Sequence, residues 1–236
     1  NYTWNFAVGH QVTEQTRLHA NAGTAFRAPS ANDLYLPFTG NPDFDPEESI
    51  SGEVGITHRV TPNDTLRLVA FRTEIDDLIE FNLFTFENTQ IEKARIKGVE
   101  FGYSHRSSRW AWSLDYTYMD PKNRDFNQKL ARRARNKVDA SIGYDTSNWW
   151  TEAALRYQSE RLNGRPSAFG SEVKLDSYTT VDLGAGYRFS PSVTVSGRVQ
   201  NLFDEEYALA ATGAGDLYLA QDRFFSVELR YDYDRQ

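Results

Sequence analysis

Apolar and polar residues alternate along most of this chain with a period of two residues. In the first segment Tyr2, Trp4 and Phe6 share one face of an extended strand, while the residues between them share the other. The same alternation returns at 110–118, 181–189 and 225–233. This period is typical of a β-strand that has one apolar face, whereas an amphipathic helix needs apolar residues three and four positions apart. We therefore expect an all-β protein.

The alternation predicts about eleven strands, each close to the 9–11 residues with which a tilted strand crosses a bilayer. Their expected ranges are 2–12, 17–26, 50–60, 65–80, 91–105, 110–120, 136–145, 149–158, 177–189, 193–203 and 221–233. Short turns follow the odd-numbered strands of this series. Long connections follow the others, including 27–49, 121–135, 159–176 and 204–220.

Alternating short and long connections are typical of outer-membrane β-barrels, whose short turns lie in the periplasm and whose long loops lie outside the cell. The last expected strand then ends on the side of the short turns, which predicts a periplasmic carboxyl terminus. Since the chain begins at Asn1, inside an expected strand and without a leader segment, we expect it to be part of a longer protein.

Composition agrees with strands that face lipid on one side and water on the other. The mean hydropathy is -0.63, and no apolar run approaches the roughly 18 residues of a membrane helix. Alternation explains the low value, because polar and apolar positions cancel in the average. Aromatic residues, which make up 14% of the chain, gather near expected strand ends, as at a lipid–water boundary. The alternative is that they fill the core of a soluble β-sheet protein.

Charge and residue usage exclude several classes of function. A net charge of -7 argues against a nucleic-acid partner, which requires a basic surface. The chain has no cysteine, which excludes disulfides, thiol catalysis and cysteine zinc sites. Its four histidines lack metal-ligand spacing, and no nucleophile turn is present. We therefore expect no catalytic residues, no metal site and no cofactor.

Two charged clusters allow more than one interpretation. Asp43, Asp45, Glu47 and Glu48 lack the glycine and the terminal glutamate of a calcium loop, so we interpret them as part of a structural turn. Arg132, Arg133 and Arg135 either bind lipopolysaccharide phosphates or form salt bridges within a loop, and the sequence favours neither.

Four short motifs, in a fixed order, carry a family resemblance. They are Phe26-Arg27-Ala28-Pro29, Asn41-Pro42-Asp43-Phe44-Asp45-Pro46-Glu47, the segment 91–100 that ends in Gly98-Val99-Glu100, and Asn201-Leu202-Phe203-Asp204-Glu205-Glu206-Tyr207. Each is similar to a motif of the TonB-dependent outer-membrane receptors, except that Phe44 stands where that family usually has leucine. The family usually ends on an aromatic residue that the barrel-assembly machinery recognises. Tyr233 is the candidate for that signal here, followed by three further residues.

The resemblance implies a transmembrane antiparallel β-barrel of 22 strands with a plug in its lumen. Residues 1–236 would form its carboxyl-terminal half, with the plug domain and the amino-terminal strands outside this chain. An open half-barrel would expose unpaired amides to lipid, so the edges must pair with further strands or with a second copy. The implied partners are the lipid bilayer, lipopolysaccharide, the barrel-assembly machinery and, through the plug, the TonB complex.

The implied function is capture of a scarce metal chelate and its TonB-energised import across the bacterial outer membrane into the periplasm. Segments 75–79, 93–100 and 130–135 are similar to the cobalamin-receptor branch, which favours vitamin B12 as cargo. A ferric siderophore or haem is the alternative within the family, and a passive porin-like barrel or a soluble binding module lies outside it. From their position in long loops, the expected ligand contacts are Tyr35, Phe38, Thr39, Arg161, Asn163, Arg165, Tyr218 and Gln221.

Overall fold

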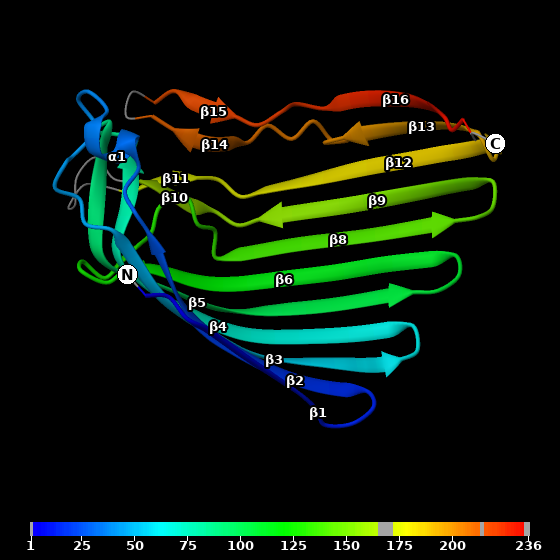
Figure 1. Ribbon diagram of the computed structural model, residues 1–236. Coiled ribbons are helices and arrows are strands. Elements are labelled where there is room, and N and C mark those ends of the chain that lie inside the picture. Colours follow the sequence, from blue (N-terminus) through cyan, green and yellow to red (C-terminus); the bar gives the residue numbers. More distant parts are fainter. Residues whose placement is uncertain (1, 165–171, 213–214, 234–236) are drawn as a thin grey trace.

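One large antiparallel sheet dominates the computed structural model, which describes residues 2–164, 172–212 and 215–233 (Figure 1). Twelve strands form this sheet, and eleven of them follow one another in chain order from β1 to β16, while β7 pairs only with β6. Two small hairpins, β10–β11 and β14–β15, lie outside it. The elements are β1 (Asn5–Gln11), β2 (Thr16–Arg27), α1 (Ala31–Tyr35), β3 (Glu47–Thr61), β4 (Asp64–Asn82), β5 (Glu87–Arg106), β6 (Trp110–Asn123), β7 (Gln128–Lys129), β8 (Asn136–Asp145), β9 (Trp149–Gln158), β10 (Arg161–Gly164), β11 (Val173–Leu175), β12 (Tyr178–Ser190), β13 (Val193–Gln200), β14 (Ala208–Ala211), β15 (Leu217–Leu219) and β16 (Phe224–Tyr231).

The all-β prediction and the eleven predicted strands are confirmed, with differences at their ends. β4 and β5 are longer than expected, and together they form the extended hairpin at the left of Figure 1. β13 ends at Gln200 instead of residue 203, because Asn201 has a left-handed φ of 50° that takes the chain out of the strand. The expected long connections contain α1 and the short strands β7, β10, β11, β14 and β15.

The strand register gathers apolar side chains into one continuous band. Across six neighbouring strands, for example, Leu66, Tyr103, Leu114, Ala140, Leu155 and Val181 are consecutive partners. Many side chains of the band are exposed, and Val54 and Phe225 remain 60% and 65% accessible. No described element covers this face. Since an apolar surface that spans a whole sheet is unstable in water, the face requires an apolar environment.

The opposite face of the sheet is polar and carries ion pairs between neighbouring strands. Arg156 on β9 lies 3.0 Å from its register partner Asp139 on β8, and Arg67 on β4 lies 3.7 Å from Glu100 on β5. These groups are largely exposed, so each pair stabilises the fold by at most about 1 kcal/mol. The two faces therefore differ in chemistry, as the alternation predicts.

Each short turn begins at a serine or threonine whose hydroxyl oxygen accepts a hydrogen bond from a backbone amide two or three residues ahead. These residues are Thr13, Thr61, Ser107, Thr146 and Ser190. Such local bonds favour a tight reversal over continuation of the strand. All five turns lie at one end of the sheet (Figure 1). They fix the register of five hairpins at that end.

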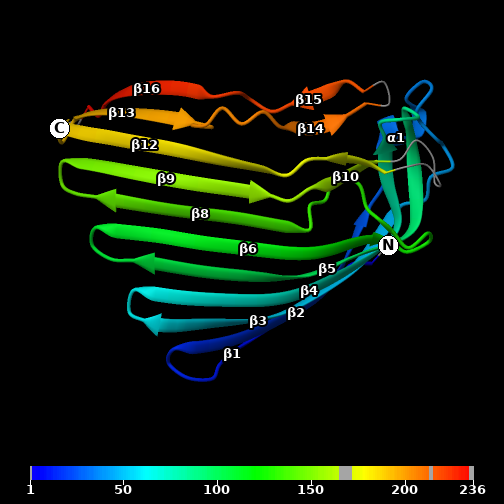
Figure 2. The same ribbon diagram turned by 180° about the vertical axis from the view of Figure 1, so that it is seen from behind.

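The ends of the sheet match the predicted topology. The last strand, β16, ends beside the short turns, where the amide of Asp232 donates to the carbonyl of Ser192. β1 and β16 each pair on one side only among the described strands, and they lie far apart in both views of the sheet (Figures 1 and 2). The described chain is thus an open, curved sheet, and its closure into a barrel of 22 strands stays a prediction.

Gly98, in the third motif, permits a close approach of β5 to its neighbours. A Cβ atom added at this position would lie 2.2 Å from the carbonyl oxygen of Tyr118 and 2.7 Å from the ring of Phe71. Both distances are far inside van der Waals contact. Only glycine fits here without a shift of the backbone.

We expect Gly98→Ala to lower the free energy of unfolding by about 1–3 kcal/mol, the usual effect of overpacking a close contact. The measurement is the temperature at which the detergent-solubilised protein loses its compact migration on an unheated gel. Gly143→Ala is the matched control, because its Cβ would have no neighbour nearer than the Thr151 carbonyl at 3.7 Å. Equal melting temperatures for Gly98→Ala and the control would contradict the steric role.

Candidate functional site

The long connections and the outer ends of β4 and β5 gather at the end of the sheet opposite the short turns, and Figure 2 shows the same arrangement from behind. There α1, β7 and the two small hairpins lie near the extended β4–β5 hairpin. The seven predicted ligand contacts that lie within the described residues belong to this end or to the segments next to it. We refer to this region as the loop end of the sheet.

The first long connection is fastened at its base and along its length. Arg27 donates two hydrogen bonds, of 2.7 and 2.6 Å, to the two carboxylate oxygens of Glu47, its register partner on β3. Glu47 also accepts a bond from the backbone amide of Ile79 on β4. Farther along, Gln90 on β5 donates to the carbonyl of Asp45. The first two motifs therefore close this loop and hold it against the β4–β5 hairpin.

Helix α1 inside this loop begins with a capping box. The hydroxyl of Ser30 accepts from the amide of Asp33, and the carboxylate of Asp33 accepts from the amide of Ser30. The second bond, together with the Ser30 hydroxyl and the Arg27 guanidinium, lowers the pKa of Asp33 below its ordinary 3.8. The carboxylate thus stabilises the start of the helix in its charged form.

The interpretation of the acidic cluster in this loop as a structural turn agrees with its contacts. Asn41 accepts from the amide of Asp43, while Asp45 and Glu47 are held by Gln90 and Arg27. Within the described residues no group of three or more His, Asp or Glu side chains could hold a metal ion. Nor does any described helix have the length and apolar character to cross a membrane.

A second connection, residues 130–135, lies between the β4–β5 hairpin and β10. The side chain of Arg132 donates to the carbonyl of Phe81, while its amide donates to the carbonyl of Leu162. Arg133 forms a 2.8 Å ion pair with Glu80. Leu130 is buried with Leu78 and Ala94 in the small apolar core at this place. For Arg132 and Arg133 the structure therefore supports bonding within the loops.

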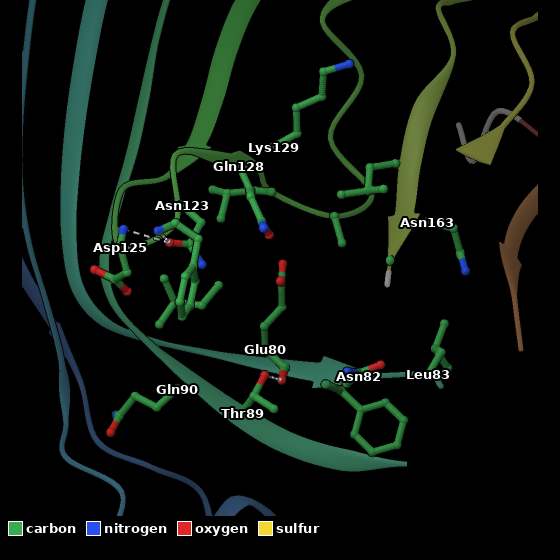
Figure 3. A pocket seen from close by; sticks show the side chains of 17 residues that line it. Glu80, Asn82, Leu83, Thr89, Gln90, Asn123, Asp125, Gln128, Lys129 and Asn163 are labelled. Atoms are coloured by element: carbon green, nitrogen blue, oxygen red, sulfur yellow. Dashed lines mark hydrogen bonds between the residues drawn. The ribbon is translucent and has the colours of Figure 1, made fainter. Parts of the chain in front are cut away.

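A cavity of about 260 Å³ opens between these segments (Figure 3). Its walls come from β4, β5, the β6–β7 hairpin and β10, and they combine apolar rings with carboxylate and amide groups. In Figure 3 the side chains of Glu80 and Gln128 point toward each other across the cavity, while Lys129 points away. The volume lies below the 300–1,000 Å³ typical of a pocket that encloses a whole ligand. The cavity could therefore receive an edge or a side group of a bulky ligand, but not all of it.

Two predicted ligand contacts, Arg161 and Asn163, are buried and hold β10 against β14. Arg161 donates a 2.6 Å bond to the carbonyl of Ala208, and Asn163 exchanges two hydrogen bonds with the backbone of Ala211. Only 5% and 1% of their surfaces are accessible. Burial lowers the pKa of the Arg161 guanidinium, whose Nη1 has no hydrogen-bond partner, although its carbon lies over the ring of Tyr178.

The other predicted contacts differ in exposure. Tyr35, Phe38, Tyr218 and Gln221 are exposed, and Phe38 is 99% accessible with a left-handed φ of 68°. Thr39 is half-buried, and Arg165 lies outside the described residues. Sequence reasoning missed the cavity residues Glu80 and Gln128. The one available signal was the length of the fourth and fifth expected strands, 65–80 and 91–105, which are the longest of the series.

The last motif forms a turn that closes β13. Asn201 is buried, has a φ of 50°, and exchanges two hydrogen bonds with the backbone of Glu205. Asp204, with a φ of 58°, accepts from the amide of Arg223 just before β16. The ring of Tyr207 stacks on Tyr178 at 3.9 Å between centroids. These motif residues thus shape the backbone between two strands.

Comparisons with known proteins assign this architecture to a family. The model of the TonB dependent receptor-like β-barrel matches residues 1–202. The vitamin B12 transporter BtuB of Vibrio vulnificus is 30% identical over 98% of this chain and 37% of its own length. BtuB of Photobacterium profundum is 29% identical over 99% of this chain and 38% of its own length. This chain therefore spans less than two fifths of these relatives.

Solved structures show the same fold at lower sequence identity. A variant of the ferric enterobactin receptor PfeA of Pseudomonas aeruginosa has a TM-score of 0.82, with 20% identity over 99% of this chain and 40% of that chain. The copper transporter OprC has a TM-score of 0.81, with 21% identity over 96% of this chain and 38% of that chain. Their likeness concerns the fold alone.

We expect Asn201→Ala to destabilise the protein by about 2–4 kcal/mol. The change removes two hydrogen bonds of a buried side chain, and it leaves alanine in a left-handed backbone conformation that no side-chain hydrogen bond stabilises. The readout is the thermal midpoint of the detergent-solubilised protein. Phe203→Ala in the same turn is the control, since its side chain is 72% accessible, and it should change stability by less than about 0.5 kcal/mol.

The loop helix should open in acid. Because the pKa of Asp33 is lower in the folded loop, its stabilising effect is fully present above the ordinary pKa of 3.8 and is lost as the pH falls through the folded value. Amide hydrogen exchange in α1, corrected for the intrinsic rate, should accelerate below about pH 4. Asp33→Asn should exchange faster at neutral pH and lose this acid dependence. A variant with the wild-type pH profile would contradict this assignment.

Proposed function

The chain belongs to the TonB-dependent receptor family, and on that premise we propose that it forms the carboxyl-terminal part of a plugged outer-membrane barrel that imports a scarce metal chelate. The single observation that carries the proposal is the continuous apolar band on one face of a sheet whose opposite face is polar. A strand that faces lipid outside and a polar lumen inside has this chemistry.

The placement of the strands supports the proposal that further strands complete the barrel. Among the described strands β1 and β16 each present an unpaired edge, which lipid does not tolerate because it offers no hydrogen-bond partners. Further strands of the same protein would pair with them and complete the 22-stranded wall. In this arrangement the short turns and the end of β16 lie in the periplasm, and the loop end faces outside. Tyr233 remains the candidate for the assembly signal.

Transport in this proposal needs no covalent chemistry. The ligand binds at the loop end, and the TonB complex then pulls on a plug that belongs to another part of the protein. The polar inner face, with its cross-strand ion pairs, would border that plug. Exposed aromatic residues such as Tyr35 and Phe38 give a bulky ligand rigid contact area, and the cavity beside Glu80 receives one edge of it.

Cobalamin is the favoured cargo, supported by the sequence likeness to two vitamin B12 transporters over almost the whole chain. A ferric siderophore or haem is the alternative within the same transport mechanism. The loop end supplies contacts that either kind of large, rigid chelate could use.

We expect the complete protein in detergent to bind cyanocobalamin in a titration and to leave a panel of ferric siderophores and haem unbound. The double variant Tyr35→Ala/Phe38→Ala should weaken binding by about tenfold or more, because two exposed aromatic contacts are lost. Phe189→Ala is the control: its ring is 66% accessible at the end with the short turns. If only a siderophore or haem binds, the proposed cargo is wrong but the proposed receptor function still holds. Binding of none of these ligands, with passive passage of small solutes, would favour a porin.

A further inference from the structure

The cavity at the loop end is lined by both apolar and hydrogen-bonding side chains (Figure 3). Its apolar lining includes Leu130 and Leu162, which are only 1% and 4% accessible. Its polar lining includes the carboxylates of Glu80 and Asp125. Side-chain amides come from Asn82, Gln90, Asn123, Gln128 and Asn163. A ligand group that enters the cavity therefore meets hydrogen-bonding groups beside an apolar surface.

The strand register places these polar groups on two elements. Glu80 and Asn82 are two residues apart on β4 and share one face of that strand. Asn123 and Gln128 are register partners in the β6–β7 hairpin, so their side chains also share a face. In Figure 3 Glu80 and Gln128 point toward each other across the cavity. A carboxylate from one element thus lies opposite amides from the other.

Local hydrogen bonds orient two of the side-chain amides. The side-chain oxygen of Asn82 accepts from the amide of Phe84 at 2.9 Å, and that of Asn123 accepts from the amide of Asp125 at 2.9 Å. The nitrogen of each side-chain amide donates to no described residue. Both nitrogens are therefore available as donors to a ligand group.

The charges at the cavity disfavour an anionic ligand group. The carboxylate of Glu80 only accepts hydrogen bonds, and its cationic partner, Arg133, is engaged with it at 2.8 Å. Lys129 is the one cation among the described lining residues, and its side chain points away from the cavity in Figure 3. An anionic group would therefore lie beside a carboxylate without a cation of its own, which is costly away from water.

We propose that this cavity binds an uncharged primary amide at the edge of the imported chelate, and that Glu80 selects the amide against an anionic group. A primary amide both donates and accepts, which matches the carboxylate of Glu80 and the side-chain nitrogens of Asn82 and Asn123. The methylene groups that carry the amide would lie against Leu130 and Leu162. A propionamide side chain has five non-hydrogen atoms, and at about 30 Å³ for each water-sized group it fits into about 260 Å³. The proposal rests on the proposed uptake function and adds the chemistry of the bound group.

The test compares cyanocobalamin with its monocarboxylic acids, in which one propionamide side chain is replaced by propionate. Each compound is titrated against the complete protein in detergent at neutral pH. The acid whose altered side chain enters the cavity should bind about tenfold or more weakly than cyanocobalamin, because its charge is buried beside Glu80. The other acids should bind within about twofold of cyanocobalamin, since their charges stay in water.

Glu80→Gln should bring the affinity for the weakened acid to within about threefold of that for cyanocobalamin. The opposing carboxylate is then gone, and Arg133 becomes available to the propionate. Glu160→Gln is the matched control, because Glu160 also pairs with a cation at the loop end, Lys174 at 2.9 Å, but does not line the cavity. This control should leave the ratio of the two affinities unchanged.

Asn82→Asp is a second, nearly isosteric variant. It keeps an oxygen that accepts from the amide of Phe84 but replaces the donor nitrogen with an oxygen. It should weaken the binding of cyanocobalamin by about tenfold, because the amide oxygen of the ligand loses a hydrogen bond. Compact migration on an unheated gel verifies that each variant is folded.

The outcomes separate this subsite from the uptake function itself. Binding of cyanocobalamin with no loss for any of the acids would overturn the subsite and leave the function intact. A weakened acid whose relative affinity is the same in Glu80→Gln would also overturn it, since the selection would then lie elsewhere. If the protein binds an anionic ferric triscatecholate but none of the cobalamins, both the favoured cargo and the amide assignment are wrong. If no chelate binds, the proposed function fails, and the subsite fails with it.

Discussion

The hydrogen-bonded ladder between neighbouring strands is the constraint on which the rest of the structure depends. A slip of one residue in any hairpin would move every side chain of that strand to the other face of the sheet. Eleven strands keep the alternation in phase, so that apolar partners meet from β1 to β16. The turns maintain this phase with local bonds, in which Thr13 or Thr146 caps the reversal with its own hydroxyl. Gly98 maintains the same phase at a point where β5 approaches its neighbours too closely for any side chain to fit.

The strands were predictable because the period of two residues depends on each strand's own sequence. Outside the apolar band this signal disappears. β4 and β5 continue past the band with charged residues on both faces, so the sequence underestimates their length, and the cavity they enclose was not expected. The short strands β10 and β14 could not be predicted from the sequence for a different reason. Each is only four residues long and pairs with β11 or β15, and the two hairpins are joined where Asn163 bonds to Ala211, which lies 48 residues away in the chain. No local pattern reports such a contact.

The same limit explains why the predicted ligand contacts differ in exposure. Tyr35 and Phe38, in a long loop, are exposed. Arg161 has the same kind of sequence position but is buried, because its guanidinium ties one hairpin to another. The motif residues were recognisable without a structure. Only the structure shows their physical role, which is a positive φ at Asn201 and paired hydrogen bonds between Arg27 and Glu47.

Charge is distributed differently on the two faces of the sheet. On the polar face a cation meets one carboxylate from a neighbouring strand, as in the pairs of Arg156 with Asp139 and of Arg67 with Glu100. That face is close to neutral at each pair and suits contact with water or with another polar surface. Beyond the apolar band Asp120 instead serves three cations. Three cations around one carboxylate repel one another, and that repulsion is a cost that the one-to-one pairs of the polar face avoid.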